Sequence, residues 1–266
     1  VGDWVELPFG KDDVLRRGQV KAVMDCTRMV APWPPEQTKT VIRTIDAPAV
    51  KPTIEVAVPT SPKRVEQPEK EAEKIVSIGD TASFVGGFVK CGDNVVSKAL
   101  DNRVGCAILM QALSEIKDCE NDLYFVFTTQ EEVGLRGAKT AAFAINPDIA
   151  VAVDVTDTGD TPSAPTMAIE LGKGTAIKVM DRSIMCDADV RTMMIETAKK
   201  NKIPYQLEIM TDGGTDAGAI HLTRAGIKTG GISVPTRYVH SPSEMASVSD
   251  IENSVKLLYN IAIAQW

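Results

Sequence analysis

The chain has 266 residues, of which 44% are hydrophobic, and a formal net charge of −7. This composition supports a folded core, and the acidic balance without clustered basic residues disfavours nucleic acid as a main partner. The sequence has no apolar run long enough to span a bilayer, and its five cysteines form no Cys-x-x-Cys pair, so we expect no membrane partner and free thiols in a reducing cytoplasm.

The sequence pattern of the first third of the chain is typical of a small β-rich unit. Residues 41–45 and 53–58 alternate between apolar and polar side chains, a pattern typical of strands. Residues 59–73 are proline-rich and then charged, which indicates a surface loop. We therefore expect a β-rich accessory domain over residues 1–92 and a second domain over residues 93–266.

The second domain alternates between helical and strand patterns. Helices are predicted at 102–117, 188–200, 216–225 and 249–264, and strands at 123–128, 148–155, 205–210 and 228–234. Such alternation predicts an α/β fold with a mostly parallel sheet flanked by helices.

Two adjacent glutamates, Glu131 and Glu132, follow the apolar run 123–127. In open α/β sheets, ligands bind where the strands end. One carboxylate of such a pair can bind a metal ion while its neighbour takes a proton from water. For the pair alone, a solvated loop after a strand remains the simpler interpretation.

Two further carboxylates and a histidine fall near predicted strand ends. Asp101 precedes a predicted helix and also fits as its N-cap. Asp154 interrupts an apolar strand, where burying a carboxylate is costly without a partner or a metal. His240 lies in a loop after a strand, where it could equally be an ordinary loop histidine.

Carboxylates and a neutral imidazole form a mixed oxygen and nitrogen set that suits zinc, cobalt or manganese. We expect four side chains on successive strand ends of one sheet to form a metal site: Asp101, Glu132, Asp154 and His240. Glu131 would be the base beside it. The second histidine, His221, lies inside a predicted helix, and we expect a structural role for it.

Five segments in a fixed order carry a more specific signal: residues 99–106, 130–138, 152–156, 213–217 and 239–242. Together they closely resemble the glutamyl aminopeptidase family of dinuclear metallopeptidases, which includes the tetrahedral, dodecameric aminopeptidases. The resemblance runs nearly without gaps from about residue 95 to the end of the chain.

The resemblance implies two divalent metal ions, zinc or cobalt. Asp101 would bridge the two ions, and Glu132 and His240 would complete one site. Asp154 would belong to the second site. Glu131 would be the general base.

The resemblance also implies a function. The protein would be a metal-dependent aminopeptidase that removes N-terminal residues from peptides, with Asp216 near the substrate pocket. It would be a cytoplasmic homo-oligomer, and the unit over residues 1–92 would mediate the subunit contacts.

One departure from the family bears on these expectations. The family has a further histidine ligand in a His-x-Asp motif before its inserted β-rich domain, whereas no histidine precedes His221 here. We therefore expect this chain to begin inside the inserted domain, to hold fewer than two metal ions per subunit, and to have very weak activity or none. A non-catalytic or truncated assembly subunit of the same fold would also account for the missing histidine.

Two further functions stay open on chemical grounds. A glycosidase of the endoglucanase type would use carboxylates such as Glu131 and Asp154 and would leave His240 and Asp101 without a role. A demonstrated need for a divalent metal separates it from a peptidase. The second is a deacylase or carboxypeptidase of related architecture, which a substrate panel would identify.

Overall fold

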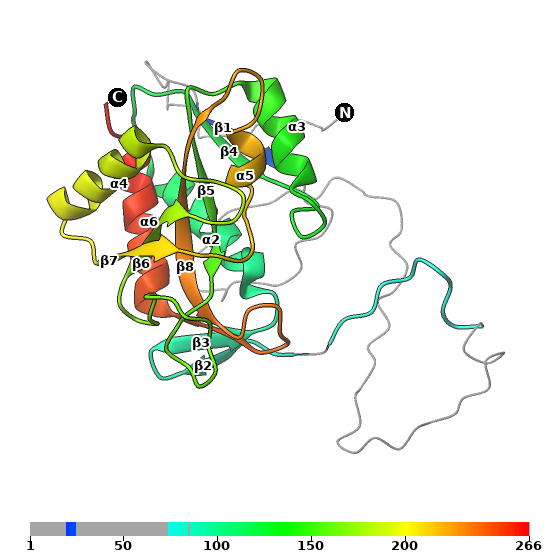
Figure 1. Cartoon of the computed structure of the whole chain (residues 1–266). Coiled ribbons are helices and arrows are strands. Elements are labelled where there is room, and N and C mark those ends of the chain that lie inside the picture. Colours follow the sequence, from blue (N-terminus) through cyan, green and yellow to red (C-terminus); the bar gives the residue numbers. More distant parts are fainter. Residues whose placement is uncertain (1–19, 25–73, 85, 266) are drawn as a thin grey trace. The chain divides into compact units, whose positions relative to one another are not determined.

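The computed structural model describes residues 20–24, 74–84 and 86–265 (Figure 1). The chain falls into two compact units, of which one comprises Val1–Thr27 and Phe88–Trp266 and the other Arg28–Gly87. The strands expected at 41–45 and 53–58 lie outside the described residues. The β-rich accessory domain therefore remains a prediction.

The larger unit is an α/β structure. Its described helices are α2 (Leu100–Glu115), α3 (Arg136–Ile145), α4 (Ala188–Lys200), α5 (Ala217–Ile220) and α6 (Val248–Ala262). Its described strands are β1 (Val20–Met24), β2 (Val89–Cys91), β3 (Asn94–Ser97), β4 (Leu123–Phe127), β5 (Ile149–Thr156), β6 (Thr175–Met180), β7 (Tyr205–Ile209), β8 (Lys228–Arg237) and β9 (Glu244–Ser247).

The main sheet is mixed, so the prediction of a mostly parallel sheet is corrected. Its seven strands follow the order β2-β3-β9-β8-β6-β7, and β5 also pairs with β8. Only β5–β8 and β6–β7 are parallel, whereas the remaining four pairings are antiparallel. The cause is local for β2 and β3, because Gly92, at φ 60°, and Asp93 join them in a two-residue turn. Such a turn can connect only antiparallel neighbours.

Strand β4 does not lie in that sheet. It pairs in parallel with β1, from Val20 opposite Leu123 to Met24 opposite Phe127. The expectation that all the site residues follow strands of one sheet is therefore wrong for the two glutamates after β4.

The helices differ from the predictions in two places. The helix expected over 216–225 is only α5, which ends at Ile220, and the chain passes through turns before β8 begins. Helix α3 has no counterpart among the predicted helices. By contrast, α4 occupies the predicted residues 188–200, and the side chain of Asp187 caps it by accepting hydrogen bonds from the backbone N–H groups of Asp189 and Val190.

The apolar core lies between one face of the main sheet and helices α2, α4 and α6. Ile177 and Ile232 of the sheet, Ile108 of α2, Met194 of α4 and Leu257 of α6 are fully buried there. Because successive strand residues point to opposite faces, the neighbouring positions present polar side chains on the second face. Lys178, the neighbour of Ile177, is one of these polar side chains, and its buried ion cluster is described below.

Within the part of the chain that the structure describes, no helix combines the length and apolar character that a membrane crossing requires. The cytoplasmic location stays a prediction.

Candidate metal centre

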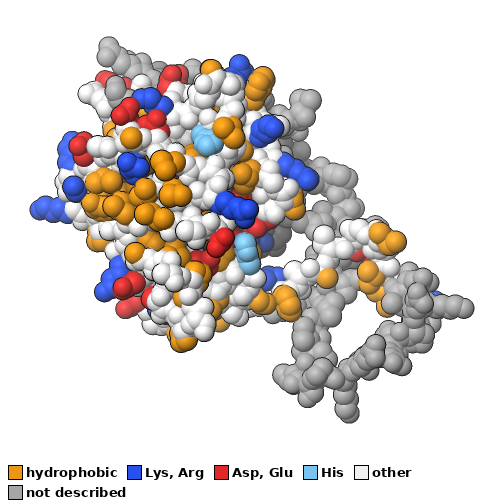
Figure 2. Space-filling view, viewed as in Figure 1, with side chains coloured by type: hydrophobic (Ala, Val, Ile, Leu, Met, Phe, Trp, Pro, Cys, Tyr) orange, Lys and Arg blue, Asp and Glu red, His pale blue; other side chains and the backbone are white. Residues whose placement is uncertain are grey.

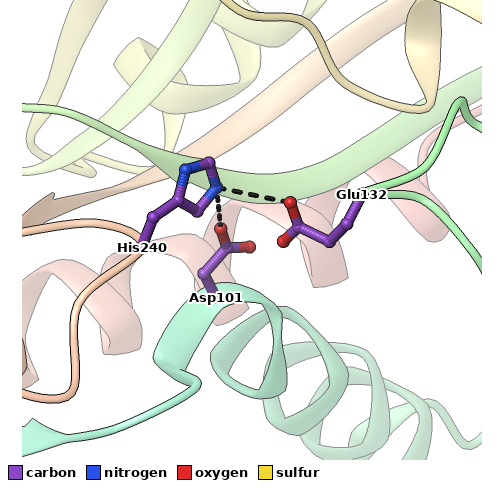
Figure 3. Close-up of side chains that lie close together, drawn as sticks. All are labelled: Asp101, Glu132 and His240. Atoms are coloured by element: carbon purple, nitrogen blue, oxygen red, sulfur yellow. Dashed lines mark ion pairs between the residues drawn. The ribbon is translucent and has the colours of Figure 1, made fainter. Parts of the chain in front are cut away.

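Asp101, Glu132 and His240 come together from three separate segments (Figure 3). Each offers one ligand atom, and the three atoms lie within 4.8 Å of one another. Nε2 of His240 is 3.1 Å from Oδ2 of Asp101 and 3.4 Å from Oε2 of Glu132. The structure thus gathers three of the four side chains that the sequence suggested as ligands.

One side chain of the group is nearly buried, and the other two are exposed to solvent. The side chain of Asp101 is 10% exposed, whereas those of Glu132 and His240 are 58% and 70% exposed. Figure 2 shows a histidine beside acidic side chains at the surface of this face. A ligand arriving from solvent can therefore reach these side chains.

The electrostatics of the group favour a cation. The pKa of Asp101 is raised to about 6, first by burial and then by the negative charge of Glu132, while His240 opposes the rise. Carboxylates crowded in this way repel one another, and a positive charge between them relieves the repulsion. Two carboxylate oxygens and an imidazole nitrogen also form a donor set that suits zinc or cobalt. The residues present therefore fit a divalent metal.

The backbone around Asp101 explains how its side chain leaves the helix. Asp101 and Asn102 have non-helical dihedral angles inside the first turn of α2, and the peptide bond between them is cis. The Asn102 side chain accepts a hydrogen bond from Gly105 N at 3.0 Å and donates one to the carbonyl of Val153 at 2.8 Å. Asn102 therefore fills the capping role considered for Asp101, and the carboxylate of Asp101 stays free for the group.

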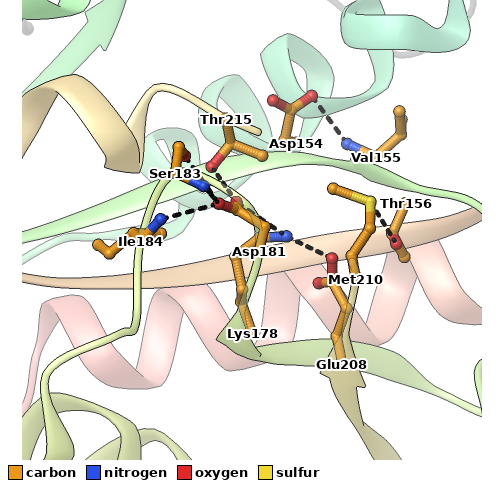
Figure 4. Close-up of polar contacts among 10 residues, drawn as sticks. All are labelled: Asp154, Val155, Thr156, Lys178, Asp181, Ser183, Ile184, Glu208, Met210 and Thr215. Carbon is orange, nitrogen blue, oxygen red and sulfur yellow. Dashed lines mark hydrogen bonds and ion pairs between the residues drawn. The ribbon is translucent and has the colours of Figure 1, made fainter. Parts of the chain in front are cut away.

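Asp154 lies deeper than the three gathered ligands. It is 7% exposed, and its Oδ1 accepts a hydrogen bond from Val155 N at 2.9 Å (Figure 4). Its pKa is raised well above the usual range, first by burial and then by the charge of Asp101. The charge of Asp101 therefore reaches it, but it is not part of the three-residue group.

Glu131 is half-buried beside the group and does not belong to it. Its pKa is raised to about 7, first by burial and then by the negative charges of Asp216, Glu132 and Asp101. A carboxylate held in this way is suited to exchange a proton near neutral pH. Two neighbouring glutamates thus have different surroundings, one inside the group and one beside it.

The loop that carries both glutamates is closed by the start of α3. The backbone N–H groups of Gly134 and Leu135 donate to the carbonyl of Glu131 at 3.0 and 2.9 Å, and Gly137 N donates to the carbonyl of Thr129 at 3.0 Å. A Cβ at Gly137 would lie 2.6 Å from both the nitrogen and the oxygen of Thr129. Only glycine fits this approach without displacing the loop.

We expect Gly137→Ala to destabilise the protein by about 1–3 kcal/mol, because added volume at a tight contact forces the backbone apart. Thermal or denaturant unfolding measures this loss. Gly87→Ala is the control, since its Cβ would meet nothing within 4 Å and no positive φ applies there. Equal stability of the two variants would show that the Thr129 backbone yields at little cost.

The negative charge of Asp216 contributes to the raised pKa of Glu131. Its Oδ2 accepts a hydrogen bond from Thr128 Oγ1 at 2.6 Å, whereas its Oδ1 is buried with no hydrogen-bond partner among the described residues. Burial raises the pKa of Asp216. His221, at the C-terminal cap of α5, is outside the three-residue group, and burial lowers its pKa.

A buried ion cluster supports the loop that leads to Asp216 (Figure 4). Lys178 of β6 is 1% exposed, forms an ion pair with Glu208 of β7, and lies 3.4 Å from Oδ2 of Asp181. Oδ1 of Asp181 accepts hydrogen bonds from Ser183 N and Oγ, both at 2.7 Å, and Oδ2 accepts one from Thr215 Oγ1 at 3.5 Å. The cluster thus ties β6 and β7 to the residue before Asp216.

Sequence reasoning missed this cluster and also missed Glu244. The signal for the cluster is a single charged residue in each of two apolar strands, Lys178 and Glu208, with opposite signs. The carboxylate of Glu244 accepts hydrogen bonds from the backbone N–H groups of Asp101 and His240. Its signal is weaker, a glutamate four residues after a candidate histidine with Pro242 between them.

Known proteins are similar to this chain in sequence and in structure over about three quarters of its length. A protein from Acetivibrio thermocellus described as an aminopeptidase is 62% identical over 189 residues, which cover 71% of this chain and 57% of that protein. An aminopeptidase structure from Desulfurococcus kamchatkensis is 36% identical with a TM-score of 0.70, covering 74% of this chain and 57% of that one. The Pyrococcus horikoshii TET1 peptidase, which can assemble into a tetrahedron or a large octahedral shell, is 35% identical with a TM-score of 0.64, covering 74% and 58%.

The chain spans about half the length of the curated relatives it matches. The family model for the M42 glutamyl aminopeptidases matches residues 64–257, which include all the candidate site residues described above. This match covers more than half of the chain, and the related structures share its α/β fold. The chain therefore belongs to the M42 glutamyl aminopeptidase family.

Proposed function

We propose that the protein is a metal-dependent aminopeptidase that hydrolyses N-terminal residues from peptides. The observation that carries this proposal is the open group of Asp101, Glu132 and His240 with the half-buried Glu131 beside it. Family membership supports the same activity. In this proposal, three side chains bind a divalent ion and the fourth handles protons.

The ion is zinc or cobalt in this proposal, and its ligands are Asp101, Glu132 and His240. Three protein ligands are the number that catalytic zinc sites use, since they leave a position open. A bound divalent ion would make water more acidic and polarise the carbonyl of the scissile peptide bond. A second ion, if the protein holds one, would use Asp101 and Asp154.

Glu131 is the proposed general base. Its carboxylate accepts a proton from the attacking water and then donates it to the leaving amine. Asp216 is proposed to lie near the substrate, because its negative charge acts on Glu131 and would attract the free ammonium group at the peptide's N-terminus. A negative charge of this kind would favour peptides with a free N-terminus over blocked ones.

The test compares a peptide that has a free N-terminus with the same peptide after N-terminal acetylation, using the purified protein with and without a chelator. We expect release of the first residue from the free peptide only, retention of at least one divalent ion per chain, and loss of activity on chelation. Cleavage of a β-glucan in the presence of the chelator would favour a glycosidase instead. Absence of both metal and peptidase activity would favour a non-catalytic assembly subunit.

Self-association is part of the proposal, because the related TET1 peptidase forms closed assemblies. A homo-oligomer, for which we propose a dodecamer, should give a molar mass by light scattering that is a multiple of the chain mass. A monomer mass at all concentrations would contradict this part.

A further inference from the structure

The carboxylate of Glu244 accepts hydrogen bonds from the backbone N–H groups of two proposed metal ligands. Its Oε2 accepts a hydrogen bond from Asp101 N at 3.0 Å, and its Oε1 accepts one from His240 N at 2.9 Å. The residue is 2% exposed, so water does not compete freely for these oxygens. A single buried side chain therefore links two residues that are far apart in the sequence.

Both ligands need such a link because they lie on irregular backbone. Asp101 has non-helical dihedral angles at the start of α2, where the first N–H groups of a helix lack partners within it. His240 has a positive φ of 61°, a conformation that non-glycine residues hold only when their surroundings impose it. Hydrogen bonds to a fixed acceptor impose such a conformation.

The position of Glu244 is itself fixed by the sheet on both sides. As the first residue of β9, it pairs with Ser97 of β3, the strand that leads to Asp101. The next residue, Met245, pairs with Arg237 of β8, the strand that leads to His240. Strand β9 therefore lies between the two strands that lead to the ligands, and the pairing on both sides fixes the backbone from which the Glu244 side chain projects.

We propose that Glu244 is a positioning residue that sets the spacing of Asp101 and His240 and thereby the metal affinity of the centre. This inference rests on the metal centre of the proposed function. It goes beyond that function, because it assigns a role to a side chain that contributes no ligand atom to the group.

A simpler role for Glu244 would be to support the fold as a cap for α2 and nothing more. The chain offers a matched control for this possibility in Asp250 of α6. Asp250 is fully buried, and its two oxygens accept hydrogen bonds from Gly172 N at 2.6 Å and Gly174 N at 2.8 Å. It thus makes the same kind of link between two backbone amides, which belong to a loop that carries none of the proposed ligands.

The experiment compares Glu244→Gln with Asp250→Asn. Each substitution keeps the size of the side chain and replaces one acceptor oxygen with an NH₂ donor, which cannot accept from a backbone N–H. The readouts are the dissociation constant for Co²⁺, from competition with a chromogenic chelator, the visible absorption of the Co²⁺-saturated protein, and the melting temperature of the metal-free protein.

We expect both variants to melt at lower temperatures than the wild type. Only Glu244→Gln should weaken Co²⁺ binding, by about 10- to 100-fold, and change the Co²⁺ spectrum, because outer residues that orient ligands have effects of this size. Asp250→Asn should bind Co²⁺ like the wild type.

Wild-type affinity in Glu244→Gln would overturn the inference, as would an equal loss in Asp250→Asn, while leaving the proposed centre in place. A wild-type protein that binds no Co²⁺ would overturn the proposed centre, and the role of Glu244 would fall with it. The two failures are therefore distinguishable in one set of measurements.

Discussion

Glu131→Gln is expected to lower kcat by about 10²–10⁴-fold, the usual effect of losing a general base, while metal affinity stays near that of the wild type. The reason is positional. Glu131 lies beside the three-residue group without belonging to it, and its pKa is raised to about 7 by burial and by neighbouring negative charges. An amide has nearly the same shape but cannot take up a proton. Steady-state kinetics and metal content measure the two quantities separately.

The adjacent residue is the control, because Glu132 is 58% exposed and contributes an atom to the group. Glu132→Gln should weaken metal binding, and added metal should restore part of its activity, whereas added metal should not rescue Glu131→Gln. Equal metal loss in the two variants would mean that the roles of the neighbouring glutamates are wrongly assigned.

Local sequence patterns predicted a helix or strand well where residues within or next to that element determine its ends. Helix α4 begins after the capping residue Asp187 and covers the predicted residues 188–200, and β5 and β7 agree with the predictions to within a residue. Periodicity and capping act within a few residues of each other, so the sequence displays them directly.

The order and direction of the strands could not be predicted in this way. The sheet is mixed because β6 and β9, which have no counterparts among the predicted strands, pair antiparallel with β8. Strand β4 leaves the main sheet because it pairs with β1, about a hundred residues earlier in the chain. Such pairings depend on contacts between distant segments, which periodicity alone does not contain.

In the candidate site too, local features could be predicted and features that depend on distant contacts could not. The residue types suited to a metal were visible in the sequence, and three of them, Asp101, Glu132 and His240, do come together. The depth of Asp154 was less visible, since it depends on which face of β5 is covered. Glu244 has only a weak sequence signal as a functional residue because it acts through backbone N–H groups, and the sequence does not show which backbone groups lack partners.

Lys178→Met is expected to destabilise the protein by about 3–5 kcal/mol, the cost of removing one partner from a buried ion pair. Lys178 is 1% exposed, and the side chains of its two partners, Glu208 and Asp181, are fully buried. Methionine fills much of the same volume, so the loss comes from charge and not from a cavity. The two carboxylates then face each other without a cation, and Oε2 of Glu208 already has no hydrogen-bond partner among the described residues. Denaturant unfolding measures the loss.

Lys228→Met is the matched control, because Lys228 pairs with Asp189 at 2.7 Å on the surface, with 53% and 80% of the two side chains exposed. Water solvates both charges there, so the loss should lie within the error of measurement. The double variant Lys178→Met with Glu208→Gln should recover part of the stability, because it removes one of the uncompensated charges. If Lys178→Met were as stable as Lys228→Met, the buried ion pair would contribute no more to stability than the surface pair. The cluster could then not be what ties β6 and β7 to the loop before Asp216.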